Sequence, residues 1–524
     1  MLITEYLKRN ATLYGEEIAL VELFYIGDSL NATRRMLSWQ DFERKANRFA
    51  HLLLRRGLKK GTKIGILMMN CLEFLPIYFG ILKAGCIVVP MNYRYTADEI
   101  AYCLDLADVE VLVFSEEFID RMDVIVDKIP QVHTLFFEGE HLPAYAEDCI
   151  ALSFDCPYED PGISVVGDDF AAIYFSSGTT GFPKAILHCH TALASACVIE
   201  QNHHSQTRDD VFLCIPPLYH TGAKIHWFGS LLSGSRAVLL RGTKPEQILY
   251  TVSEEGCTNV WLLVPWVQDI LNALDSGQIR LSDYCLKQWH LMHIGAQPVP
   301  PVLIQQWKQY FPQQDYDTNY GLSESLGPGC IHLGTKNLNK VGSIGKAGHL
   351  WETRIVDDYG VEVPSGQAGE LIVKGPCTML CYYKNPKATA EVLKNGWLYT
   401  GDVAKKDEDG FIFLIDRKKD VIISGGENIY PVQIENFLRT SPKVKDTAVI
   451  GLADERLGEI VAAIIELKEG VSSSEVEFND FCQGLPRYKR PRLFFFAPIP
   501  RNPTGKIEKP LLREKYSSCL VSKN

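Results

Sequence analysis

Hydroxyl side chains and glycines are concentrated between Tyr174 and Lys184, a stretch that reads Tyr-Phe-Ser-Ser-Gly-Thr-Thr-Gly-Phe-Pro-Lys. Glycines allow backbone N–H groups to turn toward an anion, and the hydroxyls and the lysine ammonium add further donors. Pro183 and the glycine spacing exclude a P-loop of the form G-x-x-x-x-G-K-[ST]. A flexible Ser/Gly surface turn is the plain alternative. The specific string favours a phosphate-binding loop formed by Ser176, Ser177, Gly178, Thr179, Thr180, Gly181 and Lys184.

This loop resembles the signature loop of the ANL superfamily, which comprises acyl-CoA synthetases, adenylation domains and luciferases. Two further strings, Asn319–Glu324 (Asn-Tyr-Gly-Leu-Ser-Glu) and Pro500–Lys506 (Pro-Arg-Asn-Pro-Thr-Gly-Lys), resemble other motifs of the same family, in the family's order. Ser325 follows Glu324 where the G-x-S-x-G elbow of hydrolases would need a glycine. The resemblance implies an enzyme that activates a carboxylate with MgATP as an acyl-adenylate and then transfers the acyl group to coenzyme A.

The resemblance assigns nucleotide contacts to the middle of the chain. Tyr320 would stack on adenine, Ser323 would contact the α-phosphate, and Glu324 would bind Mg²⁺, a hard ion that prefers oxygen ligands. Thr318 stands where the family often has Asn or Gln. The other nucleotide contacts expected here are Gly295, Ala296, Gln297, Asn319 and Gly321.

The ribose and the reacting carboxylate have their own expected contacts. Tyr399-Thr400-Gly401-Asp402 resembles the ribose motif, in which Asp402 accepts two hydroxyl hydrogen bonds and Arg417 is the second contact. Asp402 could instead form only a structural Asx turn. Lys506 would be the adenylation lysine, placed between the substrate carboxylate and the α-phosphate. The expected catalytic residues are Lys506, Glu324, Thr180 and His220.

A charged stretch, Asp416–Asp420, resembles the family's hinge, with Asp416 in place of its usual glycine and Lys419 as the pivot. A solvated charge run is the alternative. We predict an adenylate-forming N-terminal domain over residues 1–417 and a mobile C-terminal lid domain over residues 418–524. The lid would rotate between adenylation and thioester formation.

Coenzyme A is expected on the C-terminal domain. The run Ser424–Pro431 resembles the loop that lines the family's pantetheine tunnel, and its paired glycines, Gly425 and Gly426, allow close approach of a ligand. In the run Leu485–Pro491, Tyr488 could stack on the adenine of coenzyme A, and Arg490 and its neighbour Lys489 could meet the phosphates. A basic surface loop is the alternative interpretation.

The acid itself is expected near Pro216–Ala223, which resembles the family's acyl segment. The segment lacks the Asp with which amino-acid-activating domains pair the substrate amine, which argues against an α-amino acid. The pocket residues implied are His220 as the gate, Gly222, Trp227, Trp266 and Val267. These favour an aromatic or medium-length acid, while Lys224 and His226 could meet a second polar group or face solvent.

Three alternatives remain open. A stand-alone enzyme could load the phosphopantetheine of a carrier protein, because that arm and coenzyme A share the reactive end; the basic cluster Arg487–Arg490 favours free coenzyme A. A luciferase-like oxygenase has no signal in the sequence. A catalytically dead sensor is disfavoured by the retention of Lys506, Glu324 and Asp402.

Charge and composition limit the partners. The 524 residues carry a net charge of −11, which argues against a nucleic-acid binder and requires a local positive site for ATP. Of the residues, 46% are apolar and 22% charged, the balance of a soluble globular protein. The expected partner is a small carboxylic acid, with neither nucleic acid nor integral membrane contact; homo-oligomerisation is left open.

The expected location is the cytoplasm. The fifteen cysteines form no C-x-x-C pair and lie scattered, often in apolar runs, as reduced buried cysteines do. Met1–Lys8 is typical of a short amphipathic helix and not of a signal peptide. The end, Val521–Asn524, is not a peroxisomal signal, and no window reaches 18 apolar residues.

Short apolar runs that alternate with helical patterns must position these residues. Ile64–Met69, Glu73–Lys83 and Cys86–Val89 predict a β-α-β unit, which implies a parallel sheet covered by helices. Further strands are predicted at Glu110–Phe114, Val211–Cys214, Arg236–Leu240, Asn259–Leu263 and Trp289–Ile294. After about residue 345, short strands and turns predict a β subdomain, and a smaller unit follows with strands at Thr447–Ile450 and Val461–Glu466. The predicted fold is α/β: doubly wound parallel sheets plus a β subdomain, and a small α+β C-terminal domain.

Overall fold

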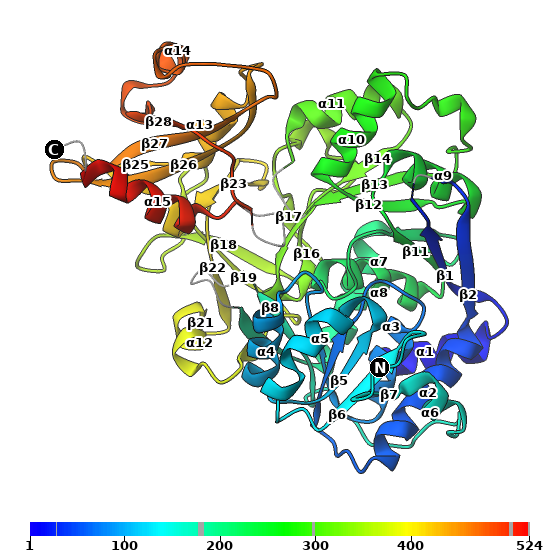
Figure 1. Ribbon diagram of the computed structural model, residues 1–524. Coiled ribbons are helices and arrows are strands. Elements are labelled where there is room, and N and C mark those ends of the chain that lie inside the picture. The colour runs from blue at the N-terminus through cyan, green and yellow to red at the C-terminus, as the bar shows by residue number, and fades with distance from the viewer. Residues whose placement is uncertain (28, 177–182, 296–298, 502–506, 522–524) are drawn as a thin grey trace. The chain divides into compact units, whose positions relative to one another are not determined.

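The computed structural model describes residues 1–27, 29–176, 183–295, 299–501 and 507–521 (Figure 1). The chain divides into two compact units. Unit 1 comprises Met1–Thr353 and Val373–Leu398, and unit 2 comprises Arg354–Ile372 and Tyr399–Asn524. The chain therefore returns to unit 1 for one segment before it completes unit 2.

Unit 1 contains an eight-stranded sheet in the order β20-β9-β8-β4-β3-β5-β6-β7. Its strands are β3 (Lys63–Leu67), β4 (Ile87–Pro90), β5 (Val109–Ser115), β6 (Thr134–Glu138), β7 (Glu147–Asp148), β8 (Phe170–Ser176), β9 (Lys184–Cys189) and β20 (Cys381–Tyr382). The strands from β4 to β7 pair in parallel, whereas β8, β9 and β20 pair antiparallel at one edge. The helices of this part are α1 (Ile3–Leu13), α2 (Trp39–Arg55), α3 (Phe74–Lys83), α4 (Ala97–Leu106), α5 (Ile119–Ile125), α6 (Cys149–Phe154) and α12 (Pro386–Val392).

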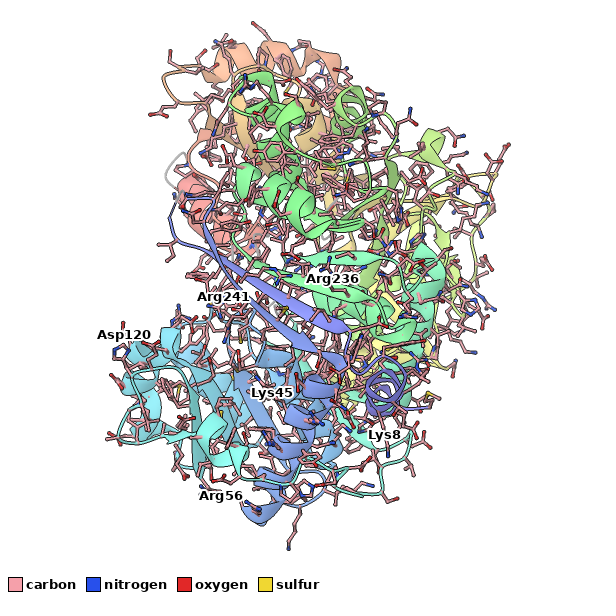
Figure 2. The ribbon with its side chains drawn as sticks, turned by 90° about the vertical axis from the view of Figure 1, so that its right-hand side faces the viewer. Lys8, Lys45, Arg56, Asp120, Arg236 and Arg241 are labelled. Atoms are coloured by element: carbon pink, nitrogen blue, oxygen red, sulfur yellow. The ribbon has the colours of Figure 1, made fainter. Side chains whose placement is uncertain are left out.

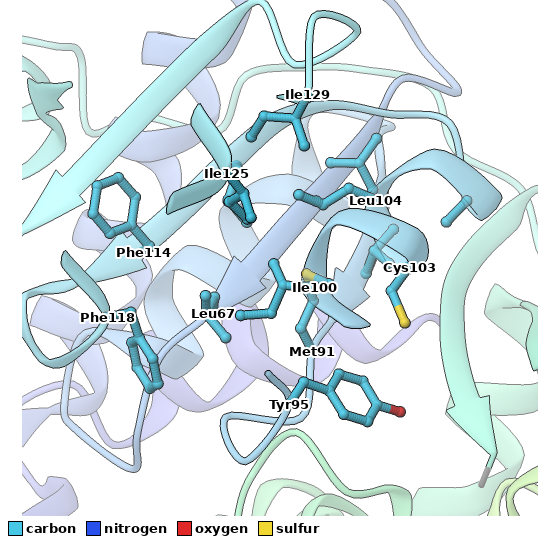
Figure 3. Close-up of a cluster of buried hydrophobic side chains, with 14 of the residues drawn as sticks. Leu67, Met91, Tyr95, Ile100, Cys103, Leu104, Phe114, Phe118, Ile125 and Ile129 are labelled. Carbon is cyan, nitrogen blue, oxygen red and sulfur yellow. The ribbon is translucent and has the colours of Figure 1, made fainter. Parts of the chain in front are cut away.

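The core of this sheet follows from its apolar runs. Strand β5 has buried residues at all but one of its positions, as strands covered on both faces do. Figure 3 shows Leu67 of β3, Phe114 of β5, and Ile100 and Leu104 of α4 in one buried cluster. Helix α4 starts at this place because Thr96 and Glu99 form a capping box.

A second, seven-stranded sheet of unit 1 has the order β14-β13-β12-β10-β11-β1-β2. Its strands are β1 (Ile18–Tyr25), β2 (Ala32–Ser38), β10 (Val211–Cys214), β11 (Arg236–Arg241), β12 (Asn259–Leu263), β13 (Leu291–Gly295) and β14 (Asp315–Asp317). All neighbours pair in parallel except β1 and β2. The connecting helices are α7 (His190–His204), α8 (Thr221–Ser233), α9 (Pro245–Glu255), α10 (Val264–Asp275) and α11 (Pro301–Tyr310). The loops that bind ligands in such sheets follow the carboxyl ends of the strands.

Arg241 connects the two large sheets. Arg241, labelled with Arg236 on β11 in Figure 2, donates from Nη1 to Glu117 at 2.7 Å, in the turn η1 (Glu116–Phe118) after β5. Its Nε donates to the carbonyl of Asn70 at 2.5 Å. Arg236 reaches Glu255 at the end of α9, 3.4 Å away.

A small antiparallel sheet follows in the chain, formed by β15 (Asn319–Leu322), β16 (Gly327–His332) and β17 (Lys346–Ala347).

Short strands occupy the first segments of unit 2 and the residues that adjoin them. These are β18 (Glu352–Val356), β19 (Gly369–Lys374), β22 (Trp397–Lys406) and β23 (Ile412–Arg417). Strand β21 (Leu393–Lys394), the hairpin partner of β22, belongs to unit 1. Asp357 and Gly360, and Asp407 and Gly410, close the turns within this part by backbone hydrogen bonds of 3.0 Å. The short strands and turns predicted from the sequence are therefore present, and they form the predicted β subdomain.

The rest of unit 2 is a five-stranded sheet covered by helices. Its strands are β24 (Ile422–Ser424), β25 (Glu427–Ile429), β26 (Val444–Asp454), β27 (Gly458–Leu467) and β28 (Leu493–Phe496), and its helices are α13 (Pro431–Leu438), α14 (Glu475–Phe481) and α15 (Lys509–Val521). Alternate residues of β27 belong to separate cores: Val461 and Ala463 pack with Ile434, and Ala462 and Ile464 pack with Leu512. The period of two therefore buries both faces of β27.

The α/β fold class is confirmed, with two mainly parallel sheets, a β subdomain and a small α+β part. The predicted strands agree with β3, β4, β5 and β10 to β13 within about two residues at each end, the usual boundary uncertainty. The first helix is longer than predicted and ends at Leu13. Among the described helices, none is long and apolar enough to cross a bilayer.

Candidate functional site

The predicted phosphate loop connects β8 and β9 along the chain. The two strands pair antiparallel, and their last pair is Ser176 with Lys184. A strand, not a helix, follows the loop, in agreement with the exclusion of a P-loop. The five predicted loop residues Ser177, Gly178, Thr179, Thr180 and Gly181 lie outside the described residues, and their roles remain predictions.

Lys184 and Glu324 converge on one tyrosine ring. Tyr382 of β20 donates a hydrogen bond from its hydroxyl to Glu324 Oε1 at 2.8 Å, and Lys184 Nζ lies 4.6 Å from the centroid of its ring. Strand β20 lies here because Tyr382 pairs with Ile186 of β9. Burial, together with the charge of Glu324, raises the pKa of the Tyr382 hydroxyl, so it remains a donor at neutral pH. The structure thus brings the end of the phosphate hairpin to the predicted magnesium ligand.

The turn that carries Glu324 is fixed from two sides. This turn, η4 (Ser323–Ser325), receives a hydrogen bond of 3.0 Å from His188 Nε2 to the carbonyl of Ser323. Burial lowers the pKa of His188 to about 4, so the ring is neutral at physiological pH. The carbonyl of Glu324 accepts from the N–H of Met379 at 2.8 Å. A single carboxylate with hard oxygen donors, positioned in this way, suits Mg²⁺ with its remaining positions filled by water and phosphate.

The predicted adenine-binding strand, β15, lies next to the end of β13. Tyr320 is 8% exposed, Gly321 is exposed, and Ser323 is partly buried. A Cβ added to Gly295 would lie 3.6 Å from Asn319 Oδ1, so these two predicted nucleotide contacts are neighbours. Ala296 and Gln297, which complete the predicted loop, lie outside the described residues.

The carboxyl edge of the second sheet gathers the predicted acyl residues. His220 is exposed and caps α8, since its Nδ1 accepts from the N–H of Gly222 at 3.1 Å. A Cβ added to Gly222 would lie 2.7 Å from Trp261 Cη2, so glycine leaves room for the indole. Trp266, in the first turns of α10, is partly buried. Gly222, in the segment after β10, and Trp261 of β12 are thus neighbours.

Trp227 and Lys224 point into the core of unit 1. Trp227 is fully buried, and its ring packs 6.0 Å from that of Phe42 and 5.8 Å from that of Phe79. Lys224 is also fully buried and donates to the Tyr174 hydroxyl at 3.1 Å. The role of Trp227 as a pocket wall therefore stays a prediction, while Lys224 does not face solvent.

Unit 2 brings the two predicted ribose contacts together. Asp402 of β22 and Arg417 of β23 are paired in register, and Arg417 Nε lies 3.6 Å from Asp402 Oδ1. The backbone N–H of Asp402 donates to Thr400 Oγ1 at 3.1 Å. The Thr400 hydroxyl in turn donates to the carbonyl of Leu371, so the backbone at Asp402 is fixed. A carboxylate next to a guanidinium can accept from one ribose hydroxyl and leave the arginine to donate to another oxygen.

The charged stretch forms the end of β23 and the turn η6 (Lys418–Asp420). Asp416 is buried and accepts the N–H groups of Arg417 and Val432 at 2.8 Å each. Lys419 is exposed. Asp416, which replaces the glycine of the family's motif, has a structural role here, and the hinge at Lys419 and the boundary at residue 417 remain predictions.

The residues predicted to bind coenzyme A are close to one another in unit 2. Gly425 and Gly426 form the two-residue loop between β24 and β25 with φ values of 59° and 87°, which fits a tight hairpin turn. Strand β25 contacts the turn η8 (Arg487–Lys489), where Tyr488 is 50% exposed. Arg490 donates to the carbonyls of Leu485 and Gln483 at 2.8 and 3.0 Å, so it also stabilises its own loop.

Two functional candidates escaped the sequence reasoning. Tyr382 stands in the plain run Cys381-Tyr382-Tyr383 and gains its role only through pairing with β9. Trp261 lies inside an ordinary buried strand and reaches Gly222 only in the folded sheet. Lys506, the predicted adenylation lysine, lies outside the described residues and stays a prediction.

The chain belongs to the AMP-binding enzyme family, whose profile matches residues 7–383, and the profile of the AMP-binding enzyme C-terminal domain matches residues 433–506. The chain is 32% identical over 482 residues to the long-chain-fatty-acid–CoA ligase FadD13 of Mycobacterium tuberculosis, covering 91% of this chain and 92% of that protein. It is 31% identical to the 2-succinylbenzoate–CoA ligase of Bacillus cereus, covering 87% and 89% of the two chains.

Solved structures agree with this assignment. The chain is similar to the anthranilate CoA ligase AuaEII in complex with anthranoyl-AMP, with a TM-score of 0.86, 25% identity, and coverage of 99% and 98% of the two chains. The predicted ANL superfamily resemblance is thereby confirmed.

Proposed function

We propose that this AMP-binding enzyme is an acid–thiol ligase that uses ATP to form an acyl-adenylate from a medium-chain or aromatic acid and then an acyl-CoA thioester. The observation that carries the proposal is the meeting of Lys184 and Glu324 at Tyr382. The relatives named above are CoA ligases, and the acids in their names differ in kind. The class of acid therefore rests on the residues of this chain.

In the first half-reaction, a carboxylate oxygen attacks the α-phosphorus of ATP and pyrophosphate leaves. Such transfers depend on positioning and charge neutralisation. Glu324 would hold Mg²⁺ on the phosphates, and Lys184 and the hydroxyls of the loop would add positive charge and donors. In unit 2, Asp402 and Arg417 would bind the ribose hydroxyls.

In the second half-reaction, the thiol of coenzyme A attacks the acyl carbon, its proton is released, and AMP leaves. The loop Gly425–Gly426 and the exposed ring of Tyr488 would receive coenzyme A. Lys506, if it acts as the adenylation lysine, would serve only the first half-reaction. Lys506→Gln should then abolish adenylation and spare thioester formation from supplied acyl-adenylate, whereas the control Lys506→Arg should retain part of both.

The acid is proposed to be medium-chain or aromatic because aromatic side chains lie in the expected acyl region. Trp261 fills the space next to Gly222, and Trp266 follows it at the start of α10. His220, exposed at the start of α8, would lie at the entrance. A very long chain would need space that these indoles occupy.

The test is pyrophosphate release from ATP with a panel of acids, with and without coenzyme A, followed by mass analysis of the product. The proposal expects an acyl-CoA thioester for aromatic or medium-chain acids. Product formed only with a phosphopantetheinylated carrier protein would instead identify a carrier-loading enzyme. Absence of pyrophosphate release with every acid would refute adenylation itself.

The hinge can be tested separately. Lys419→Pro removes backbone freedom at the predicted pivot, and Lys419→Ala removes only the side chain. We expect the proline variant to keep adenylation and lose thioester formation, and the alanine variant to keep both. Equal loss of both half-reactions in the proline variant would contradict the hinge.

A further inference from the structure

Four buried histidines meet two buried carboxylates inside unit 1, and we call this group the histidine cluster. Its members are His204 and Glu200 of α7, His226 of α8, His293 of β13, Asp317 of β14 and His332 of β16. The side chains of all six are at most 8% exposed. Their ring centroids lie 4.4 Å apart for His226 and His293 and 4.8 Å apart for His204 and His293. None of these side chains has a role in the ligase reaction proposed above.

Glu200 fixes the orientation of two of these rings. Its Oε1 lies 2.7 Å from His204 Nδ1 and 2.5 Å from His226 Nδ1, so one carboxylate oxygen accepts from both imidazoles. A ring that donates from Nδ1 presents the lone pair of Nε2 on its opposite side when it is neutral. A carboxylate that receives the rear N–H of a histidine is the usual outer contact of a metal-binding histidine.

The opposite side of the His204 ring faces His293 and Asp317. His204 Nε2 lies 3.1 Å from His293 Nδ1 and 3.5 Å from Asp317 Oδ2. His226 Nε2 and His293 Nε2 are buried without a hydrogen-bond partner among the described residues. Leaving such polar atoms unpaired in the interior is energetically costly. A metal ion that binds one nitrogen of each ring would accept the unpaired lone pair of His226 Nε2.

We propose that His204, His226 and His293 bind a divalent transition-metal ion of the Zn²⁺ type. One nitrogen of each ring lies within 4.8 Å of the others. Tetrahedral Zn²⁺ with Zn–N distances of about 2.0–2.1 Å would bring such nitrogens to roughly 3.3 Å. The separation of 3.1 Å between His204 Nε2 and His293 Nδ1 is close to this length.

Asp317 and Glu200 supply the charge that such an ion requires. Asp317 Oδ2, which lies 3.5 Å from His204 Nε2 and also contacts His332 Nε2, could take the fourth position. Oδ1 of the same carboxylate is held by the N–H groups of Thr318 and Gly334 at 2.8 and 2.9 Å. Glu200 remains the outer acceptor. Two carboxylates balance a divalent cation in an interior where an unbalanced charge would be costly.

The proposed metal site borders the expected acyl region but does not depend on it. The ring of His226 lies 4.5 Å from that of Trp261, and His293 stands two positions before Gly295 on β13. A metal ion here would fix α7, α8 and β13 relative to one another. Metal binding can therefore be measured without any assay of the ligase.

The experiment uses the full chain without a histidine tag, because a tag would itself bind metal. The protein is stripped with a chelator, and Zn²⁺ is added back and counted by elemental analysis after desalting. Co²⁺, added in place of Zn²⁺, reports the ligands through its visible spectrum. We expect one equivalent of tightly held Zn²⁺ and a tetrahedral Co²⁺ spectrum without a thiolate charge-transfer band.

The variants separate the ligand atom from its outer contact. His226→Asn keeps a polar group near the position of Nδ1 and removes Nε2, and Glu200→Gln changes only the outer carboxylate. Loss of an outer contact lowers metal affinity roughly 10–100-fold, and we expect His226→Asn to exceed that. His190→Asn is the control, since His190 is buried and lies on α7, the helix of His204 and Glu200, but outside the cluster.

The proposal is overturned if the stripped wild-type protein, after Zn²⁺ is added back and the sample is desalted, does not hold one equivalent of Zn²⁺. It is equally overturned if the Co²⁺ spectrum shows thiolate ligands. It is also overturned if His226→Asn and His190→Asn bind Zn²⁺ equally well. Circular dichroism checks that each variant is folded. If His226→Asn does not fold, the stoichiometry and the Co²⁺ spectrum of the wild-type protein decide the question alone.

Discussion

Lys224 allows a sharp test of the core of unit 1. Its side chain is fully buried, its Nζ lies 4.5 and 4.3 Å from the ring centroids of Tyr78 and Tyr174, and it donates to the Tyr174 hydroxyl. In the described part of the chain it forms no ion pair with a carboxylate. Burial therefore lowers the pKa of this amine well below its ordinary value. The substitution Lys224→Met keeps an unbranched chain of similar size and removes the titrating group.

The sign of the effect follows from proton binding. In the unfolded chain the amine holds its proton up to a pKa of about 10.4, whereas the folded protein releases it at lower pH. Between the two pKa values the unfolded state binds one more proton, so the free energy of unfolding rises by about 1.4 kcal/mol per pH unit. Unit 1 has about 380 residues, which corresponds to an unfolding entropy of roughly 0.8 kcal/mol/K. Dividing the change in free energy per pH unit by this entropy gives a shift in Tm of about 2 °C per pH unit.

The assay compares the Tm of the wild type and Lys224→Met by scanning calorimetry at one scan rate from about pH 7 to pH 9. The difference, wild type minus variant, should increase by roughly 3–4 °C over this range. Burial raises the pKa of Tyr78 and Tyr174, which therefore do not titrate in the window. Lys287→Met, at an exposed lysine, should give a difference that does not change with pH. A flat difference for Lys224→Met would mean that the buried amine stays charged, and the reasoning would be wrong.

Three further results are expected. Tyr382→Phe removes the hydrogen bond to Glu324 and should raise the Mg²⁺ concentration for half-maximal pyrophosphate release about 10-fold or more; an unchanged Mg²⁺ curve would contradict the assigned contact. Gly222→Ala places a methyl group 2.7 Å from Trp261 and should lower kcat/KM roughly 10–100-fold for the preferred acid, with a smaller loss for shorter acids; equal losses for all acids would argue against a pocket there. Burial and neighbouring carboxylates raise the pKa of Glu138 to about 7, so the wild type should lose stability relative to Glu138→Gln as the pH rises from about 4.3 to 7; a constant difference in Tm between about pH 4 and pH 8 would refute this.

The regular elements could be predicted because their signal is local. Strands β10 and β12 have the bounds Val211–Cys214 and Asn259–Leu263 that the apolar runs predict. A strand buried on both faces must be a continuous apolar run, and such a run is visible without any knowledge of its neighbours. The pairing of Asp402 with Arg417 likewise follows from two motifs that lie on adjacent strands of one hairpin.

Pairings between distant segments could not be read in the same way. Strand β1 joins the second sheet beside β11, although more than two hundred residues separate them, and its own pattern does not specify a partner. Tyr382 reaches Glu324 only because β20 adds to β9. The histidine cluster comes from five different elements, and each histidine alone resembles an ordinary core residue. Tertiary pairing decides these contacts, and no short window of sequence contains it.

The alternating path of the chain limits how the protein can be divided. The backbone passes from unit 1 to unit 2 at Thr353, returns at Val373 and leaves again at Leu398. A fragment that begins at Tyr399 would therefore lack Arg354–Ile372, including the carbonyl of Leu371 to which Thr400 donates. A fragment that ends at Thr353 would lose Tyr382. A single protease cut or a simple gene truncation thus cannot yield either unit intact, and exchange of unit 2 between relatives would have to graft two separate segments at once.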